Sequence, residues 1–217
     1  MTPEPLSPAG MRRDYTERGA LLESDLAADW TSQFARWFAE ASAAGLPEPN
    51  AMIVATADVQ GRPSARTVLL KGYDERGFVF FTNYTSRKAG ALAAQPAVAL
   101  HFGWYPLQRQ VRVEGTATRV PRVESEAYFA TRPRGSQLGA WASPQSTEVG
   151  SREELNAAYA AAEERFAGRD VPCPEHWGGF RVVPTLVEFW QGQPSRMHDR
   201  LAYRRTAVGW DLVRLAP

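Results

Sequence analysis

The first long hydrophobic pattern in the chain has the period of an amphipathic helix. Between Asp29 and Ala44 the large apolar residues recur every three or four positions and so share one face. These residues are Trp30, Phe34, Trp37, Phe38 and Ala41. Gly45 and Pro47 follow directly, and both residue types are typical of a helix end. We therefore expect a helix over residues 29–44 that packs its apolar face on a core.

Most of the remaining chain consists of short β-type runs separated by turns. Strands are expected over Ala51–Ala57, Ser64–Leu70, Phe78–Phe81, Val98–Trp104 and Gln110–Arg119, and near the C-terminus over Phe180–Trp190, Arg196–Arg205 and Trp210–Leu215. Helices are expected over Ser86–Ala94, Arg122–Arg132 and Ser151–Phe166. Short strands linked mostly by hairpins, with helices at the periphery, predict an α+β domain built on an antiparallel barrel.

The N-terminal stretch differs in composition from the rest of the chain. Residues 1–20 are rich in Pro, Gly and charged residues, which predicts a flexible arm. Residues 21–217 contain no internal linker or repeat and are expected to form a single domain. Neither the G-x-G-x-x-G pattern nor the P-loop pattern occurs, so a Rossmann-type NAD enzyme and a P-loop NTPase are not expected.

Composition narrows the classes of partner. A formal net charge of +1 predicts neither a nucleic acid nor an anionic membrane as partner. The single Cys173 excludes an internal disulfide and a cysteine metal cage, and no metal site is expected. No apolar run reaches the roughly 20 residues of a membrane span. The N-terminus has no charged-then-apolar signal pattern, so a cytoplasmic location is expected.

Lysine is rare in this chain, and one of its lysines opens a predicted helix. Of the 25 basic residues only Lys71 and Lys88 are lysines. Arg87 and Lys88 follow Ser86, a natural N-cap, and two cations in a first helical turn oppose the helix dipole. Free backbone N–H groups together with two cations suit a bound phosphate. The alternative is an exposed pair of charges without a ligand.

The other lysine follows a strand that begins with an arginine. Strict alternation along this strand places Arg66 and Lys71 on opposite faces. The two cations then serve different ligands, unless a bulge turns them to the same side. Each of them is also compatible with an ordinary charge on an edge strand.

A second group of donors surrounds the end of the helix predicted over residues 122–132. Tyr128 and Arg132 are four residues apart and share a face. Pro133 stops the helix, and residues 134–137 are expected to form a loop that presents Ser136. A phenol, a guanidinium and a hydroxyl together suit a second phosphate. However, an arginine in the last turn of a helix is favourable without any ligand.

Gln110 is a candidate for recognising a heterocycle. Its amide offers both a donor and an acceptor, which matches the edge of an amide-bearing ring, although a solvent-facing position is the simpler interpretation. His101 and His176 lack the spacing of metal ligands, and we expect them to be core or surface histidines.

Three cationic or titratable side chains share one face of the strand predicted over residues 196–205. Arg196, His198 and Arg200 alternate with Met197 and Asp199. Like charges in a row repel, which favours an anion or an electron-rich ring lying across them. The alternative is a solvated edge strand whose charges prevent aggregation.

Taken together, these segments resemble the pyridoxamine/pyridoxine 5′-phosphate oxidase family of FMN enzymes. The similarity runs in order from residue 12 to the C-terminus. The segments that carry it are Arg12–Tyr15, Arg66–Lys71, Thr82–Lys88, Arg132–Trp141, Gln145-Ser146, Trp177–Arg181, Glu188–Gly192, Arg196–Arg200 and Arg214–Pro217. Met197 is a departure, because this family usually has leucine at that position.

The resemblance implies an FMN-binding split barrel that works as a homodimer with sites at the interface. FMN would be held by Arg66, Phe81, Thr82, Arg87, Lys88, Gln110, Gln145, Ser146, Trp190 and Arg200. The substrate phosphate would be held by Lys71, Tyr128, Arg132 and Ser136. Arg196 and His198 would act as the catalytic pair at the pyridine ring, and Arg12 and Tyr15 of the arm would close over the substrate.

The implied reaction is the oxidation of pyridoxine or pyridoxamine 5′-phosphate to pyridoxal 5′-phosphate. A hydride leaves C4′ of the substrate for the flavin, O2 takes up the electrons and becomes hydrogen peroxide, and the amine substrate also yields ammonia. Two alternatives are a related FMN oxidase of phenazine biosynthesis and a non-enzymatic carrier of flavin or pyridoxal phosphate. The presence of Arg196 and His198 argues against the carrier.

Overall fold

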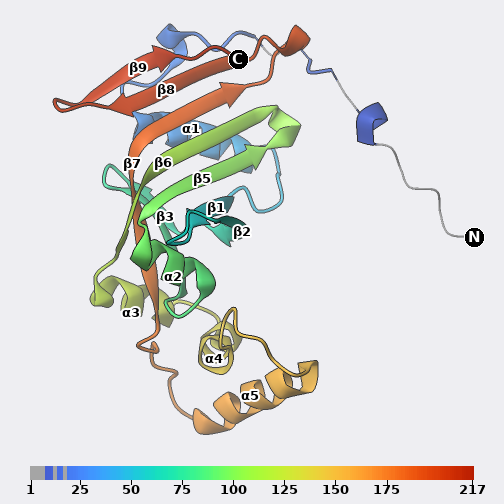
Figure 1. Cartoon of the computed structure of the whole chain (residues 1–217), viewed down its shortest axis with the longest axis vertical. Helices are drawn as coiled ribbons and strands as arrows, with labels where there is room; N and C mark the ends of the chain where they lie inside the picture. Colours follow the sequence, from blue (N-terminus) through green and yellow to red (C-terminus); the bar gives the residue numbers. More distant parts are fainter. Residues whose placement is uncertain (1–7, 12–13, 17–18) are drawn as a thin grey trace, which may run out of the picture.

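The computed structural model describes residues 8–11, 14–16 and 19–217 as one antiparallel sheet with helices around it (Figure 1). Its strands are β1 (Ala51–Ala57), β2 (Pro63–Leu69), β3 (Gly72–Asp74), β4 (Gly77–Asn83), β5 (Ala97–Trp104), β6 (Arg109–Arg119), β7 (Trp177–Gln191), β8 (Asp199–Arg205) and β9 (Trp210–Arg214). The main path of the sheet is β2-β1-β5-β6-β7-β4-β3, and β8 and β9 extend it beside β7. Antiparallel strands combined with peripheral helices confirm the predicted α+β class, and the sheet remains open, as in a split barrel.

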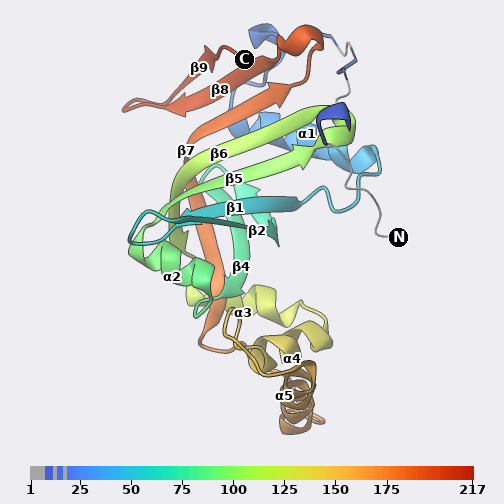
Figure 2. The same cartoon turned by 45° about the vertical axis from the view of Figure 1, so that its right-hand side comes forward.

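Helix α1 (Trp30–Ala43) fills the inside of the curved sheet, as its apolar stripe predicts. Asp29 caps it by accepting a hydrogen bond from the Ser32 amide. The Phe34 ring lies 5.1 Å from Phe102 of β5, and Trp37 lies 5.2 Å from Phe189 of β7. Alternate residues of β5 and β6 therefore point to this core, and the residues between them point outward. Figure 2 shows α1 behind strands β5 and β6.

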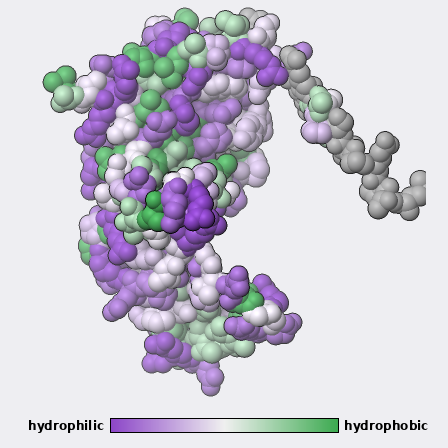
Figure 3. Space-filling model, viewed as in Figure 1, coloured by the Kyte–Doolittle hydropathy of each residue, from purple (hydrophilic) through white to green (hydrophobic). Residues whose placement is uncertain are grey.

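A second, smaller core is built by helices that project from one end of the sheet (Figure 1). In the space-filling view this part is a narrower lobe at the lower end of the molecule (Figure 3). The helices are α3 (Arg122–Ala130), α4 (Arg134–Ala142) and α5 (Arg152–Arg165), while α2 (Arg87–Ala94) lies against the sheet itself. Phe129, Leu138, Phe166 and Trp177 are buried together in the second core. Among the described residues, no helix is both long enough and apolar enough to cross a membrane.

Two expectations about local structure are wrong. Residues 134–137, expected as a loop, form the first turn of α4, because Pro133 ends one helical segment and begins the next. The strand expected from Arg196 begins only at Asp199. Pro194–Arg196 form a short 3₁₀ turn in which Ser195 and Arg196 have φ values of 54° and 64°. Strict alternation therefore does not place Arg196 beside His198.

Most other elements agree with expectation to within a few residues, and β7 is longer than expected because it begins at Trp177.

The N-terminal arm is described only in part. Pro8–Met11 form a 3₁₀ turn, and Tyr15 contacts the C-terminal region. Arg12 lies outside the described residues, so its expected contact with substrate stays a prediction.

Candidate active site

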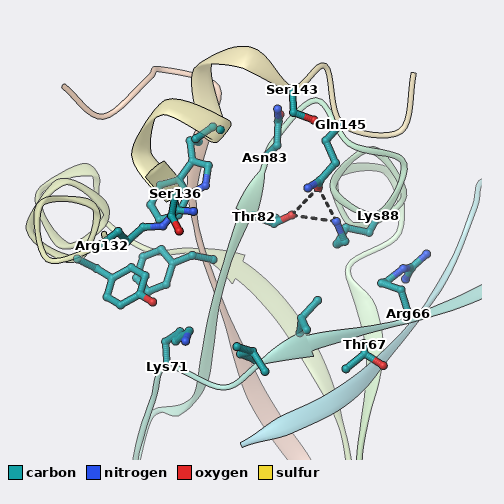
Figure 4. A pocket seen from close by; sticks show the side chains of 17 residues that line it. Arg66, Thr67, Lys71, Thr82, Asn83, Lys88, Arg132, Ser136, Ser143 and Gln145 are labelled. Atoms are coloured by element: carbon teal, nitrogen blue, oxygen red, sulfur yellow. Dashed lines mark hydrogen bonds between the residues drawn. The ribbon is translucent and has the colours of Figure 1, made fainter. Parts of the chain in front are cut away.

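A cavity of about 490 Å³ lies where the second core meets the sheet. Strands β2 and β4 and helices α2, α3 and α4 contribute its walls (Figure 4). It brings together nine residues predicted from the sequence: Arg66, Lys71, Phe81, Thr82, Lys88, Tyr128, Arg132, Ser136 and Gln145. None of the residues that line the cavity in the described part of the chain is acidic.

Lys88 and Arg66 form one cationic end of the cavity. The Lys88 ammonium donates hydrogen bonds to Thr82 Oγ1 at 2.9 Å and to Gln145 Oε1 at 2.7 Å, and both acceptors are uncharged. Its pKa is lowered to about 8 by burial and by the charge of Arg66. Ser86 caps α2 by accepting from the Ala89 amide, which fixes the helix start beside these cations.

Arg66 also binds only neutral groups within its own sheet. Its guanidinium donates to the Val54 carbonyl at 3.0 Å and to the hydroxyls of Thr56 and Ser64 at 2.9 and 2.6 Å. Burial and the nearby charge of Arg87 lower its pKa. These contacts hold the guanidinium in place, and no carboxylate in the described part of the chain pairs with it.

The other end of the cavity has an aromatic wall beside a second set of donors. Phe81 stacks on Tyr128 with ring centroids 4.2 Å apart and on Trp177 at 5.3 Å. The guanidinium carbon of Arg132 lies 4.7 Å from the Trp177 ring centroid. Burial lowers the pKa of Arg132, and its buried Nη1 has no hydrogen-bond partner among the residues that the structure describes. An unsatisfied buried donor of this kind is rare unless a ligand completes it.

The relation between Arg66 and Lys71, which the sequence left open, is now defined. Strand β2 ends at Leu69, and the Lys71 amide already bonds to Val79 of β4. The chain therefore changes direction between the two cations, and both side chains line the same cavity (Figure 4). Figure 4 shows Lys71 on the same side of the cavity as Arg132 and Ser136, and Arg66 on the side of Lys88.

Two expected FMN contacts lie next to this cavity without lining it. Arg87 is exposed at the first position of α2, and exposed Ser146 follows Gln145 with a φ of 74°. Trp177 lines the cavity although we did not predict it as a site residue. The Trp-Gly-Gly run was visible in the sequence, but nothing local showed that this ring faces Arg132.

The remaining predicted residues gather in the C-terminal region. The Tyr15 ring meets Trp190 and His198 edge-on, at centroid distances of 5.7 and 5.3 Å. His198 Nδ1 accepts a hydrogen bond from the Gln193 amide at 3.0 Å, which leaves Nε2 to carry the ring proton of the neutral imidazole. Burial and the charge of Arg196 lower the pKa of His198, and this favours the neutral form.

Arg200 is neutralised within the chain. Its guanidinium binds the buried Glu188 carboxylate at 2.8 and 3.1 Å, and Arg112 binds the same carboxylate at 2.5 Å. Burial acts to raise the pKa of Glu188, but hydrogen bonds from Arg200 and Arg112 hold it below its usual value. The expectation of unpaired charges along this strand is therefore wrong for Arg200.

Gln110 lies on β6, which pairs with β7, and it binds His101 through its amide oxygen at 2.9 Å.

Strand β7 runs from the helices α3 and α4 to the strands β8 and β9 (Figure 1). Trp177 lines the cavity, whereas Trp190 pairs with Gln110 and Arg200. The two tryptophans are 13 residues apart in β7, which corresponds to roughly 40 Å along an extended strand. A single chain therefore does not bring the C-terminal group to the cavity.

Comparison with known proteins shows full-length similarity to one family. Residues 38–166 match the family described as pyridoxamine 5′-phosphate oxidase, and residues 177–217 match a pyridoxine 5′-phosphate oxidase C-terminal dimerisation region. The pyridoxine/pyridoxamine 5′-phosphate oxidase of Rubrobacter xylanophilus is 62% identical over 96% of both chains. The protein of the same name from Salinispora arenicola is 58% identical over 100% of this chain and 99% of its own.

Two solved structures share the fold. PhzG from Burkholderia lata, solved with tetrahydrophenazine-1-carboxylic acid, superposes with a TM-score of 0.85 at 30% identity, over 91% of this chain and 98% of that one. A pyridoxamine 5′-phosphate oxidase-related, FMN binding protein from Nostoc punctiforme gives a TM-score of 0.73 at 19% identity, over 88% and 99%.

Proposed function

Because this chain belongs to the pyridoxamine 5′-phosphate oxidase family, we propose that it oxidises pyridoxine and pyridoxamine 5′-phosphates to pyridoxal 5′-phosphate. FMN is the proposed flavin and O2 the final electron acceptor, with hydrogen peroxide as product. With the amine substrate, water hydrolyses the resulting imine to the aldehyde and releases ammonia. The observation that carries the proposal is the cavity, which has cations at both ends and no carboxylate among its described lining residues.

The chain's donors fit a flavin phosphate at one end of this cavity. Lys88 and Arg66 are held by neutral oxygens, so their charge is available to an anion. The α2 start beside them adds backbone N–H groups, with Arg87 exposed in its first turn. We assign this end to FMN. When bound, FMN supplies the acceptor for the substrate hydride and passes the electrons to O2.

The other end suits the phosphate of the substrate. Arg132 has an unsatisfied buried N–H, Ser136 offers a hydroxyl, and Lys71 an ammonium. Tyr128 stacks on Phe81 and presents its phenol to the same space. Charge-assisted bonds from these groups would fix the phosphate and hence the position of C4′, and orientation of this kind lowers the barrier without a strong base.

We propose that a second copy of the chain completes the site. The matched dimerisation region covers residues 177–217, which include Trp190, Arg196, His198 and Arg200. These residues are far from the cavity of their own chain, so a homodimer in which each C-terminal region covers the partner's cavity brings both groups together. His198, kept neutral with its proton on Nε2, would donate to the pyridine substituents, and Arg196 would lie at the same ring.

A peroxide-release assay with each phosphate ester tests the function. We expect hydrogen peroxide and pyridoxal 5′-phosphate from both esters, and no turnover of the unphosphorylated alcohol and amine at the same concentration. The phenazine alternative is less favoured, because identity to PhzG is 30% against 62% to the Rubrobacter oxidase. Turnover of a tricyclic acid in place of the esters would overturn the proposal.

A further inference from the structure

His101 lies on the outward face of the sheet, in the middle of β5. Its neighbours Leu100 and Phe102 are fully buried in the core, so alternation directs the imidazole to the opposite side. In the register of β5 and β6, His101 pairs with Arg112 and Gly103 pairs with Gln110. The imidazole is therefore diagonal to Gln110, a reach that a side chain of this length spans.

The hydrogen bond between them has a defined direction. His101 Nε2 lies 2.9 Å from Gln110 Oε1, and an amide oxygen is only an acceptor. The imidazole must therefore carry a proton on Nε2 and donate it. With its oxygen engaged in this way, the amide of Gln110 presents its NH2 group as the end available to a ligand.

We propose that His101 is a positioning residue that turns the Gln110 amide so that it offers donors to the flavin ring system. This inference rests on the proposed function and on the contact between Gln110 and FMN that the family resemblance implies. An amide that is free to rotate would match either a carbonyl or an N–H of the ring, whereas an anchored amide matches acceptors only. Donors held toward the ring carbonyls stabilise the negative charge that the flavin gains on reduction. His101 thereby supports both FMN affinity and the midpoint potential of bound FMN.

Four variants test this proposal: His101→Leu, His101→Gln, Gln110→Ala and the double variant with His101→Leu and Gln110→Ala. The readouts are FMN affinity by fluorescence quenching and the midpoint potential of bound FMN, so neither depends on turnover. We expect His101→Leu to weaken FMN binding about fivefold and to lower the potential. His101→Gln, which retains a donor, should restore most of both properties. In the Gln110→Ala background, His101→Leu should have no further effect.

An equal effect of His101→Leu with and without Gln110 would overturn the proposal, because the histidine would then act through general packing. Wild-type affinity and potential in His101→Leu would overturn it as well. The proposed function fails separately, if the wild-type protein binds no FMN or releases no peroxide. A wild-type protein that binds FMN beside a silent His101→Leu variant would refute the positioning role alone.

Discussion

The cavity and the outer face of the C-terminal strands both carry arginines, but these arginines bind neutral oxygens in the cavity and a carboxylate on the outer face. In the cavity, the described partners of Arg66 and Lys88 are all hydroxyl, amide and carbonyl oxygens. On the outer face, Arg200 and Arg112 share the carboxylate of Glu188, a residue that is 3% exposed. One region keeps cations without anions, and the other neutralises them.

This difference indicates how binding and positioning are divided in the site. Cations that are buried without counter-ions cost folding free energy, which an incoming phosphate recovers. Cations that are already paired are rigid before any ligand arrives, so they suit a ring that must be oriented. We therefore expect variants in the cavity to affect binding and variants in the C-terminal region to affect turnover.

The largest effects are expected when a side chain of the cavity and a side chain of the C-terminal region are removed in separate variants. Arg132→Ala removes a contact made equally in ground and transition states, so KM for the phosphate ester should rise about 100-fold with a smaller fall in kcat. His198→Ala should instead lower kcat at least tenfold with FMN content unchanged, because the pyridine ring loses a positioning group. Steady-state kinetics on FMN-saturated proteins measures both.

Arg196→Ala serves as the second C-terminal variant in that comparison. It should behave as His198→Ala does, although its backbone lies in a 3₁₀ turn rather than in the strand. Wild-type kcat in both C-terminal variants would mean that this segment is a solvated edge, and the division between the two regions would be lost.

The second prediction uses the two lysines as a matched pair. Lys88→Met should weaken FMN binding about 100-fold, or about 3 kcal/mol, because a buried charge at the phosphate is removed. Lys71→Met removes the same charge from the exposed lysine at the other end. It should leave FMN affinity near the wild-type value and raise KM for the substrate. Equal losses of FMN affinity in both variants would contradict the assignment of the two ends.

Lys88→Met should weaken FMN binding but raise the free energy of unfolding of the apoprotein. The pKa of Lys88 is about 8 in the folded protein and 10.5 in the unfolded chain, so the charged form is disfavoured by folding. This cost is fully present below pH 8 and disappears as the pH rises through 10.5. At pH 7 the variant apoprotein should therefore be more stable by about 1 kcal/mol, after allowance for the lost hydrogen bonds. Denaturant unfolding at fixed protein concentration measures it.

The sequence predicts features that depend on neighbouring residues better than those that depend on strand register. Ser86 and Lys88 are within three positions, so cap, helix start and cation were visible together. The contact between Glu188 and Arg200 depends on which strands pair and in what register, and no local signal reports it. The same holds for His101 and Gln110.

Backbone conformation limited the prediction in a different way. Ser195 and Arg196 adopt positive φ without a glycine to signal it, so the strand was expected three residues too early. Pro133 was interpreted only as a stop, although proline also begins helices, and α4 was therefore missed. In both places the residue types are compatible with two conformations, and long-range packing selects between them.

The third prediction concerns the neutralised region. Glu188→Gln leaves Arg112 and Arg200 without their shared charge and should lower the free energy of unfolding by about 2 kcal/mol. Glu114→Gln is the matched control, because Glu114 also pairs with Arg112 but its side chain is 49% exposed. Its effect should be below about 0.5 kcal/mol. Chemical denaturation of the three apoproteins at one concentration gives the comparison, and equal stabilities would mean that solvent already screens both pairs.

The last prediction is a dependence of FMN affinity on pH between 7 and 9. Only the protonated Lys88 offers a charge to the phosphate, and its pKa of about 8 means that most of this charge is lost by pH 9 in the free protein. Binding an anion favours the protonated form, so FMN association must take up a proton above pH 8, and affinity should fall about tenfold over this range. Riboflavin has no phosphate and should show no such fall. Lys88→Arg keeps its charge throughout and should flatten the profile. A decline of the same size in Lys88→Arg would assign the titration to another group and remove Lys88 from the flavin phosphate.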